Sequence, residues 1–122
     1  MEETAYGLFQ RGAALLSEGM VREAAESLER AREMEPDKAS IREALARAYY
    51  AQGRTTDARA EFSAAACIDP SNDYAHFGLA LCLERENRLD EARGHARLAV
   101  AMKPENEDYR RALDRIERSG AS

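Results

Sequence analysis

Two histidines and two cysteines are among the side chains in this sequence that could bind a transition metal, transfer protons or act as nucleophiles. The histidines are His76 and His95, and the cysteines are Cys67 and Cys82. No two of them have the short spacing of a metal-binding motif, and two cysteines do not make a disulfide framework. We therefore predict no metal and no cofactor, with both cysteines as free thiols in a reducing, cytoplasmic compartment.

The local sequence gives none of these side chains a catalytic neighbour. His76 falls at a packing position of a predicted helix and is expected to be structural, whereas His95 falls among charged residues and is expected to be solvated. Cys82 falls at a buried position, where the neutral thiol is favoured over the thiolate. The chain also lacks a glycine-rich phosphate-binding loop and the strand–turn–helix serine motif of hydrolases. These observations predict that the protein is not an enzyme.

The net charge of the chain argues against two further classes of partner. Its 122 residues include 18 Lys and Arg against 23 Asp and Glu, a net charge of −5. General binding to nucleic acid or to anionic membranes requires excess positive charge. The arginines near the C-terminus alternate with acidic residues, which is typical of a solvated helix face. Since no long apolar run occurs, we predict a single domain, residues 1–122, with no nucleic-acid partner and no membrane insertion.

A repeat of thirty-four residues organises the chain. The only prolines, Pro36, Pro70 and Pro104, follow this spacing. Small residues recur in register with the prolines, in one column of Ala24, Ala58 and Ala92 and another of Ala31, Ala65 and Ala99. A repeat of this length is the signature of stacked helical hairpins, and such stacks mostly bind other proteins.

The helical periodicity of the apolar residues predicts seven helices. Their ranges are 4–18, 21–34, 39–52, 56–68, 74–86, 89–102 and 106–118. Thr4 and Asp73 are expected N-caps, because their side chains can accept a hydrogen bond from the first helical turn. For the fourth helix the expected cap is Thr55 or Thr56. Asn87 takes the place of a glycine at a bend, as expected for a residue that tolerates the left-handed conformation.

This pattern resembles the tetratricopeptide repeat family. The resemblance covers three repeats, at about residues 5–38, 39–72 and 73–106, followed by a capping helix at 107–118. It implies an all-α fold, a right-handed α-α superhelix of three helix-turn-helix repeats with a capping helix. It also implies a protein-interaction module or scaffold rather than an enzyme.

Residue size alternates along the packed faces as the family pattern requires. Small residues stand where the two helices of a hairpin touch: Gly12, Ala24 and Ala31, then Ala46, Ala58 and Ala65, then Ala80, Ala92 and Ala99. Larger residues such as Leu28 and Phe62 fill the gaps. Met34 and Ile68 continue these faces to the ends of their helices. The chain departs from the family at a position that often holds an aromatic residue, where it has Leu8, Arg42 and His76.

In the resembling family, the first helix of each hairpin lines a concave groove. Helical phase places these residues of this chain in that groove: Tyr6, Phe9, Ala13, Glu43, Arg47, Tyr50, Tyr74, Phe77, Leu81 and Arg85. Helical phase places five more residues in the groove, Leu16, Ser17, Ser40, Ala51 and Glu84. Beside them lie Gln10, Ala44 and Gly78, whose small size would leave room for a ligand. Because aromatic residues are typical anchors at interfaces, the groove is predicted to bind an apolar peptide segment or a partner helix.

Several alternatives remain open for this groove. Its aromatic residues could instead pack between neighbouring hairpins, and Glu43 and Arg47 could form a surface ion pair rather than contact a ligand. The residues with which some family members grip a peptide carboxylate are absent, whereas the apolar surface is similar to that of bacterial secretion chaperones of the family. A chaperone or assembly factor is therefore one hypothesis. The second is a self-associating protein, a homo-oligomer whose groove is the interface between copies.

Overall fold

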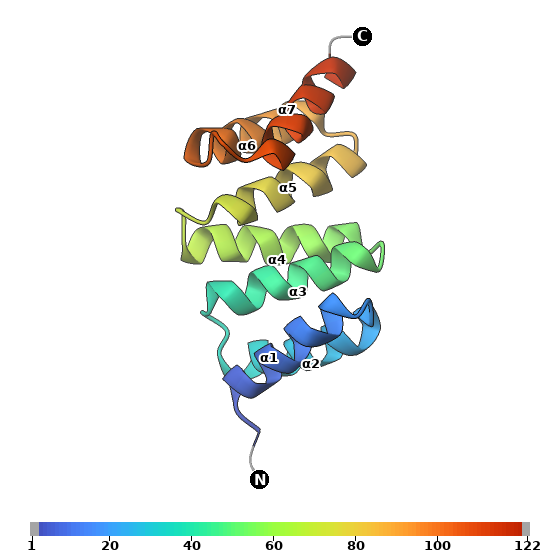
Figure 1. The fold of residues 1–122 in the computed structure, drawn as a ribbon, viewed down its shortest axis with the longest axis vertical. Helices are drawn as coiled ribbons and strands as arrows, with labels where there is room; N and C mark the ends of the chain where they lie inside the picture. The colour runs from blue at the N-terminus through green and yellow to red at the C-terminus, as the bar shows by residue number, and fades with distance from the viewer. Residues whose placement is uncertain (1–2, 121–122) are drawn as a thin grey trace.

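The computed structural model describes residues 3–120 and contains seven helices joined by short turns (Figure 1). They are α1 (Ala5–Ser17), α2 (Val21–Met34), α3 (Ala39–Ala51), α4 (Thr55–Ile68), α5 (Asp73–Arg85), α6 (Leu89–Met102) and α7 (Glu107–Gly120). Within residues 3–120 there is no strand, and no helix is long and apolar enough to cross a membrane. The hairpins stack along one axis, with α1 and α2 at one end and α7 at the other (Figure 1). The prediction of an all-α stack of three hairpins with a capping helix is confirmed.

Helix starts follow the capping rules only in part. Thr4 is the N-cap of α1, as predicted, and its Oγ1 accepts a 2.9 Å hydrogen bond from the Gly7 amide. The cap of α5 is Asn72 rather than Asp73, because Asp73 is already the first helical residue. The prediction of a threonine cap for α4 is wrong, since α4 begins at Thr55 and its N-cap, Arg54, makes no capping side-chain bond.

The bend inside each hairpin requires a left-handed residue. Gly19 and Gly53 both have a φ of +79°, and Asn87 has a φ of 59° at the corresponding place in the third hairpin. Glycine reaches this region without steric cost, and asparagine tolerates it better than most residues. The role predicted for Asn87 is therefore confirmed.

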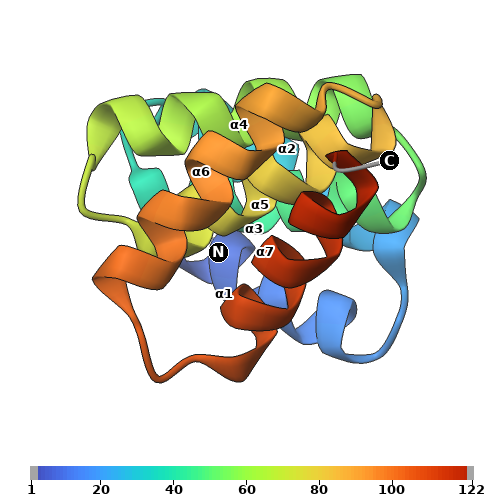
Figure 2. The same cartoon turned by 90° about the horizontal axis from the view of Figure 1, so that it is seen from above.

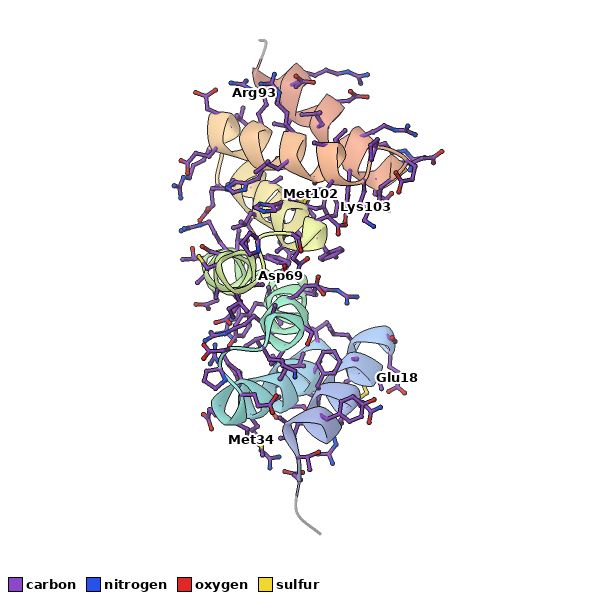
Figure 3. The ribbon with its side chains drawn as sticks, turned by 90° about the vertical axis from the view of Figure 1, so that its left-hand side faces the viewer. Glu18, Met34, Asp69, Arg93, Met102 and Lys103 are labelled. Carbon is purple, nitrogen blue, oxygen red and sulfur yellow. The ribbon has the colours of Figure 1, made fainter. Side chains whose placement is uncertain are left out.

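The small residues predicted at the helix contacts are all buried. Gly12 shows why they must be small, because a Cβ there would lie 2.5 Å from Cγ of Leu28. Met34 and Ile68, by contrast, are 52% and 38% exposed, so their placement on the packed faces was wrong. Each is the last residue of its helix, where the chain leaves the stack (Figure 3 labels Met34).

The turns between hairpins are held by a contact that repeats with the prolines. Six residues after each proline, a side chain of the following helix reaches back to the proline carbonyl. Nε of Arg42 donates to Pro36 at 2.9 Å, Nε2 of His76 lies 3.3 Å from the oxygen of Pro70, and Nη1 of Arg110 donates to Pro104 at 3.3 Å. The departure from the family pattern at Arg42 and His76 therefore has a structural role in this chain.

The stack is curved. Among the described residues, the backbones of α1 and α3, of α3 and α5, and of α5 and α7 come close together, whereas those of α2 and α4, and of α4 and α6, do not. Helices that approach one another lie on the inner side of a curve, and helices that diverge lie on the outer side. The inner face is therefore formed by α1, α3, α5 and α7, and the outer face by α2, α4 and α6 (Figure 2).

Candidate functional site

The inner face contains a cavity of about 240 Å³ between α1, α3 and α5. Its lining residues are Leu16, Arg47, Tyr50, Ala51, Phe62, Tyr74 and Leu81. Six of these, all except Phe62, were predicted to face the groove. Phe62 was predicted only as a packing residue of α4, yet its ring reaches through to the inner face. We call this space the inner cavity.

Glycine opens the path for Phe62. A Cβ at Gly78 would lie 2.4 Å from the Phe62 ring, so only glycine allows the ring to cross α5 at this level. Gly78 and Ala44 are both buried. The expectation that Gly78 leaves room for a ligand was therefore wrong, because the space beside it is already occupied by Phe62.

Aromatic rings continue from the inner cavity to the capping helix. Phe62 and Tyr74 have ring centroids 6.2 Å apart, and Tyr74 meets Phe77 edge-on at 5.7 Å. Phe77 then packs on Tyr109 of α7 at 4.7 Å. The Tyr109 hydroxyl donates a 2.5 Å hydrogen bond to Asp73, which fixes α7 against the start of α5. Phe77 thus lies among rings of its own chain, as the alternative interpretation of the aromatic residues predicted.

Two arginines lie over tyrosine rings of this face. The Arg85 guanidinium carbon is 3.5 Å from the Tyr50 ring centroid, and Arg85 Nη1 donates to the Tyr50 carbonyl oxygen at 3.1 Å. The Arg47 guanidinium carbon lies 5.6 Å from the Tyr74 centroid. Such cation–π contacts orient both the guanidinium and the ring. Arg85 therefore covers the ring of Tyr50, a lining residue of the inner cavity, while Arg47 itself lines the cavity and is exposed.

Burial shifts the ionisation of the groups around the inner cavity. Burial raises the pKa of Tyr74 and of Tyr50, although the nearby arginines oppose the shift. Burial likewise raises the pKa of Glu43, against the attraction of Arg47. Within residues 3–120 no Glu43–Arg47 contact is as short as 4 Å, so the surface ion pair that was one alternative for these residues does not form. The tyrosines are uncharged hydrogen-bonding groups at neutral pH.

A second cavity of about 420 Å³ opens where α1 starts, next to the turn before α3. It is lined by Thr4, Ala5, Tyr6, Phe9, Glu35, Lys38, Ser40 and Ile41. Tyr6 is 68% exposed, and its hydroxyl accepts a 2.9 Å hydrogen bond from Gln10. The predicted groove residues are thus divided between two cavities, since Tyr6 and Phe9 lie apart from Tyr50 and Tyr74. Ala13 and Glu43 line neither cavity.

The cysteines, histidines and acidic residues of the described chain do not gather into a metal site. In the described part of the chain, no group of three or more His, Cys, Asp or Glu side chains could hold a metal ion. Cys67 is exposed and Cys82 is buried, and both are free thiols. Burial raises the pKa of Cys82 to about 11, so this thiol stays protonated at neutral pH.

The chain matches a known family over most of its length. Residues 9–73 and residues 51–116 each match a family model described as tetratricopeptide repeat. No curated protein matches the chain in sequence. The family match supports the prediction of an interaction module rather than an enzyme.

Several solved structures share this fold at low sequence identity. The first TPR domain of Spaghetti (RPAP3), bound to an HSP90 peptide, has a TM-score of 0.94 at 19% identity and covers 98% of this chain and 94% of its own. The Arabidopsis OM64 TPR domain has a TM-score of 0.92 at 20% identity, with coverages of 95% and 96%. The Yersinia enterocolitica secretion chaperone SycD, in complex with a YopD peptide, has a TM-score of 0.86 at 17% identity, with coverages of 98% and 97%.

Proposed function

Because the chain belongs to the tetratricopeptide repeat family, we propose that it binds an apolar segment of a peptide or partner helix in the inner cavity. The single observation behind this proposal is the cavity itself. It has the size of a bulky side chain and a mostly apolar lining to which α1, α3 and α5 all contribute. A ligand there would bury Leu16, Tyr74 and Leu81, which are only partly covered by their own chain.

The inner cavity combines apolar walls with few polar groups. Tyr50 and Tyr74 supply hydroxyl groups, and Arg47 supplies one exposed cation at the edge. Binding pockets typically have this composition, because apolar area gives affinity and a few polar groups fix orientation. We infer that the ligand inserts one apolar side chain between Leu16 and Leu81 and passes Arg47 with its backbone or a polar group.

Two structural neighbours give the proposal a precedent, since the RPAP3 domain and SycD are each seen with a bound peptide. A chaperone or assembly role is a finer version of the same proposal. A cytoplasmic location and the repeat boundaries at 5–38, 39–72 and 73–106 also remain predictions.

Selection from a random peptide library tests the proposal. Ala51 is exposed and lines the inner cavity, so Ala51→Glu places a charge at its mouth without disturbing the core. Ala60 is an equally exposed helical alanine on α4, and Ala60→Glu is the matched control. We expect the wild type and Ala60→Glu to enrich peptides that share a bulky apolar residue, and Ala51→Glu to lose them. If all three proteins enrich the same peptides, or none enriches any, the inner cavity is not the binding site.

Self-association is the second candidate function, and the cavity at the start of α1 favours it. That cavity is larger than the inner cavity, and Tyr6 stands exposed on its rim. A second copy of the chain could cover these residues. Analytical ultracentrifugation over a hundredfold range of protein concentration tests this. Dimerisation through this surface should be weakened by Tyr6→Ser. A monomer at all concentrations would exclude the homo-oligomer.

A further inference from the structure

The second and third hairpins differ at one equivalent position between their two helices. In the second, Glu61 of α4 is buried and accepts from Arg42 of α3 at 3.0 Å and from Arg32 of α2 at 2.6 Å. One repeat later the corresponding residues are His95, His76 and Ala66. The place of the buried ion cluster is therefore taken by two imidazole rings and a methyl group.

The two imidazoles form a hydrogen bond with each other. Nδ1 of His76 lies 3.1 Å from Nδ1 of His95, and the ring planes are inclined by 17°. The centroids are 5.4 Å apart, which exceeds the N···N distance by about two ring radii, so the rings meet edge to edge rather than face to face. The expectation that His95 is solvated was wrong, because its ring is half-buried in this contact.

The environment determines which ring donates. Nε2 of His76 lies 3.3 Å from the carbonyl oxygen of Pro70, which can only accept, so Nε2 holds the proton of the neutral ring. Nδ1 of His76 must then accept, and Nδ1 of His95 must donate. In the described part of the chain, Nε2 of His95 makes no hydrogen bond.

We propose that the His76–His95 hydrogen bond is a pH-sensitive contact that holds α5 against α6, and that acidification opens it. A first proton goes to Nε2 of His95, and the N–H···N bond survives it. A second proton must go to Nδ1 of His76, the acceptor of that bond. Two N–H groups then face each other across 3.1 Å, and the two rings must separate.

The charges near the pair do not neutralise a second proton. Next to Ala66, a cavity of about 300 Å³ lies between α4 and α6 and is lined by His95, Glu91, Arg88, Arg59 and Cys67 among others. Glu91 accepts two hydrogen bonds from Arg88, at 3.0 and 2.9 Å, and Arg59 is paired with Glu86 at 2.7 Å. Cys67 is a free thiol. The single carboxylate near His95 is therefore already paired with an arginine.

The remaining helices that pack on α5 meet it elsewhere. From α3, Arg47 lies over Tyr74. From α7, Arg115 donates to Glu84 at 2.6 and 2.7 Å, and the Tyr109 hydroxyl donates to Asp73. On α6 itself, Arg97 pairs with Glu117 of α7 at 3.2 Å, and Arg93 pairs with Asp90 at 2.8 Å. Among the described residues, none of these groups hydrogen-bonds to either imidazole.

The ionisation of His95 agrees in sign with this inference. Burial, and secondly the neighbouring His76, lower the pKa of His95, while Glu91 opposes the shift. The folded chain then binds this proton at a lower pH than the unfolded chain does. Stability is therefore complete above the ordinary histidine pKa of about 6.5 and is lost as the pH falls towards the lowered value.

Opening this contact would act on the proposed binding face. α5 contributes Tyr74 and Leu81 to the inner cavity, and α6 is its hairpin partner. The first two hairpins contain no histidine, the side chain whose ordinary pKa lies in this pH range. Acid would therefore loosen one wall of the cavity and leave the others in place.

Nitrogen NMR of the histidine-labelled chain tests the hydrogen bond directly. At about pH 7.5 we expect His76 to be the Nε2–H tautomer and His95 the Nδ1–H tautomer, with scalar coupling across the N–H···N bond. The coupling should disappear at about pH 5. If both rings show the same tautomer at neutral pH, or titrate as independent free imidazoles, the inference is overturned.

Amide exchange tests the structural consequence. The pH is lowered from about 7.5 to about 5.5, and the exchange rates are corrected for their intrinsic pH dependence. The protection of the backbone amides in α5 and α6 should then fall about tenfold more than that in α3 and α4. This is the effect expected from the loss of one hydrogen bond between buried groups.

The matched variant is the double substitution His76→Arg with His95→Glu, which reproduces the Arg42–Glu61 pair of the second hairpin. It should abolish the additional loss of amide protection in α5 and α6 at low pH. If that variant does not fold, His95→Gln keeps a hydrogen-bonding side chain without the titration and should do the same. An unchanged pH response in the variant that folds would overturn the inference.

Discussion

The second and third hairpins have the same backbone plan and different chemistry at one interior position. The second is closed by a carboxylate between two guanidinium groups, Arg32–Glu61–Arg42, and the third by the neutral pair His76–His95. Both hairpins keep their columns of buried alanine, Ala58 and Ala65 in one and Ala92 and Ala99 in the other. The small residues are therefore the shared requirement of the fold, whereas the polar position can hold groups that respond differently to pH.

The difference also affects packing. Arg32 fills the space beside Glu61, but Ala66 is too short to fill the corresponding space beside His95, where the cavity of about 300 Å³ lies. The third hairpin is therefore less filled on its outer side. On its inner side it is tighter, because Gly78 admits the Phe62 ring.

Glu61→Ala should give the largest loss of stability. It leaves Arg32 and Arg42 partly buried without their shared carboxylate, which should reduce the free energy of unfolding by about 3 kcal/mol. Urea denaturation measures this, with the exposed Glu33→Ala as a control expected to change it by less than about 0.5 kcal/mol. Equal effects for the two variants would show that the ion cluster does not hold the second hairpin together.

Gly78→Ala should give the next largest loss of stability. The new Cβ would overlap the Phe62 ring at 2.4 Å, and displacing the ring should cost about 2 kcal/mol. The same displacement should change the inner cavity, because Phe62 lines it. Urea denaturation measures the loss of stability, and tyrosine fluorescence reports the change at the inner cavity. A stable variant with unchanged fluorescence would contradict the close approach of α4 and α5.

His95→Ala should cost less than Glu61→Ala, although the two residues are equivalent. Removing His95 breaks one hydrogen bond between neutral rings and leaves no buried charge, so the expected loss at about pH 7.5 is about 1 kcal/mol. The loss should shrink as the pH falls below 6.5, because the wild type loses its own stabilisation there. Urea denaturation at several pH values measures both. If the loss of stability caused by His95→Ala instead grew as the pH fell, the lowered pKa inferred for His95 would be contradicted.

Gly94→Ala should have the smallest effect, and in the opposite direction. Gly94 lies inside α6, and a Cβ there meets nothing within 4 Å. Alanine restricts the unfolded chain and favours helix, so the free energy of unfolding should rise by about 0.5–1 kcal/mol, and the midpoint of thermal unfolding should rise with it. Thermal denaturation of Gly94→Ala and of Gly78→Ala, measured side by side, compares the same substitution at two helical glycines. Destabilisation by both would mean that α6 is packed on the face that contains Gly94.

The sequence predicted the fold well because the fold depends on period and residue size. The spacing of the prolines and the buried alanine columns determine where each helix ends and which residues touch, and both can be read from the chain alone. Met34 and Ile68 were misplaced because periodicity does not report where a helix end leaves the stack. The Arg42 contact to Pro36 was missed, although its spacing recurs three times.

The candidate site was predicted less completely, because side-chain direction depends on neighbours in other repeats. Helical phase placed Tyr50, Tyr74 and Leu81 correctly on the inner face. It could not show that Phe62 of an outer helix reaches the same cavity, since that depends on Gly78 in the next repeat. Nor could it show that His95 meets His76, because the two lie on separate helices whose register is set by packing.

The most direct test of the proposed binding face is an NMR structure of the chain with a peptide enriched by the library selection. We expect nuclear Overhauser contacts between an apolar side chain of the peptide and Leu16, Tyr74 and Leu81, together with shifts at Ala51. Contacts confined to α2 and α6 would place the ligand on the outer face and contradict the account.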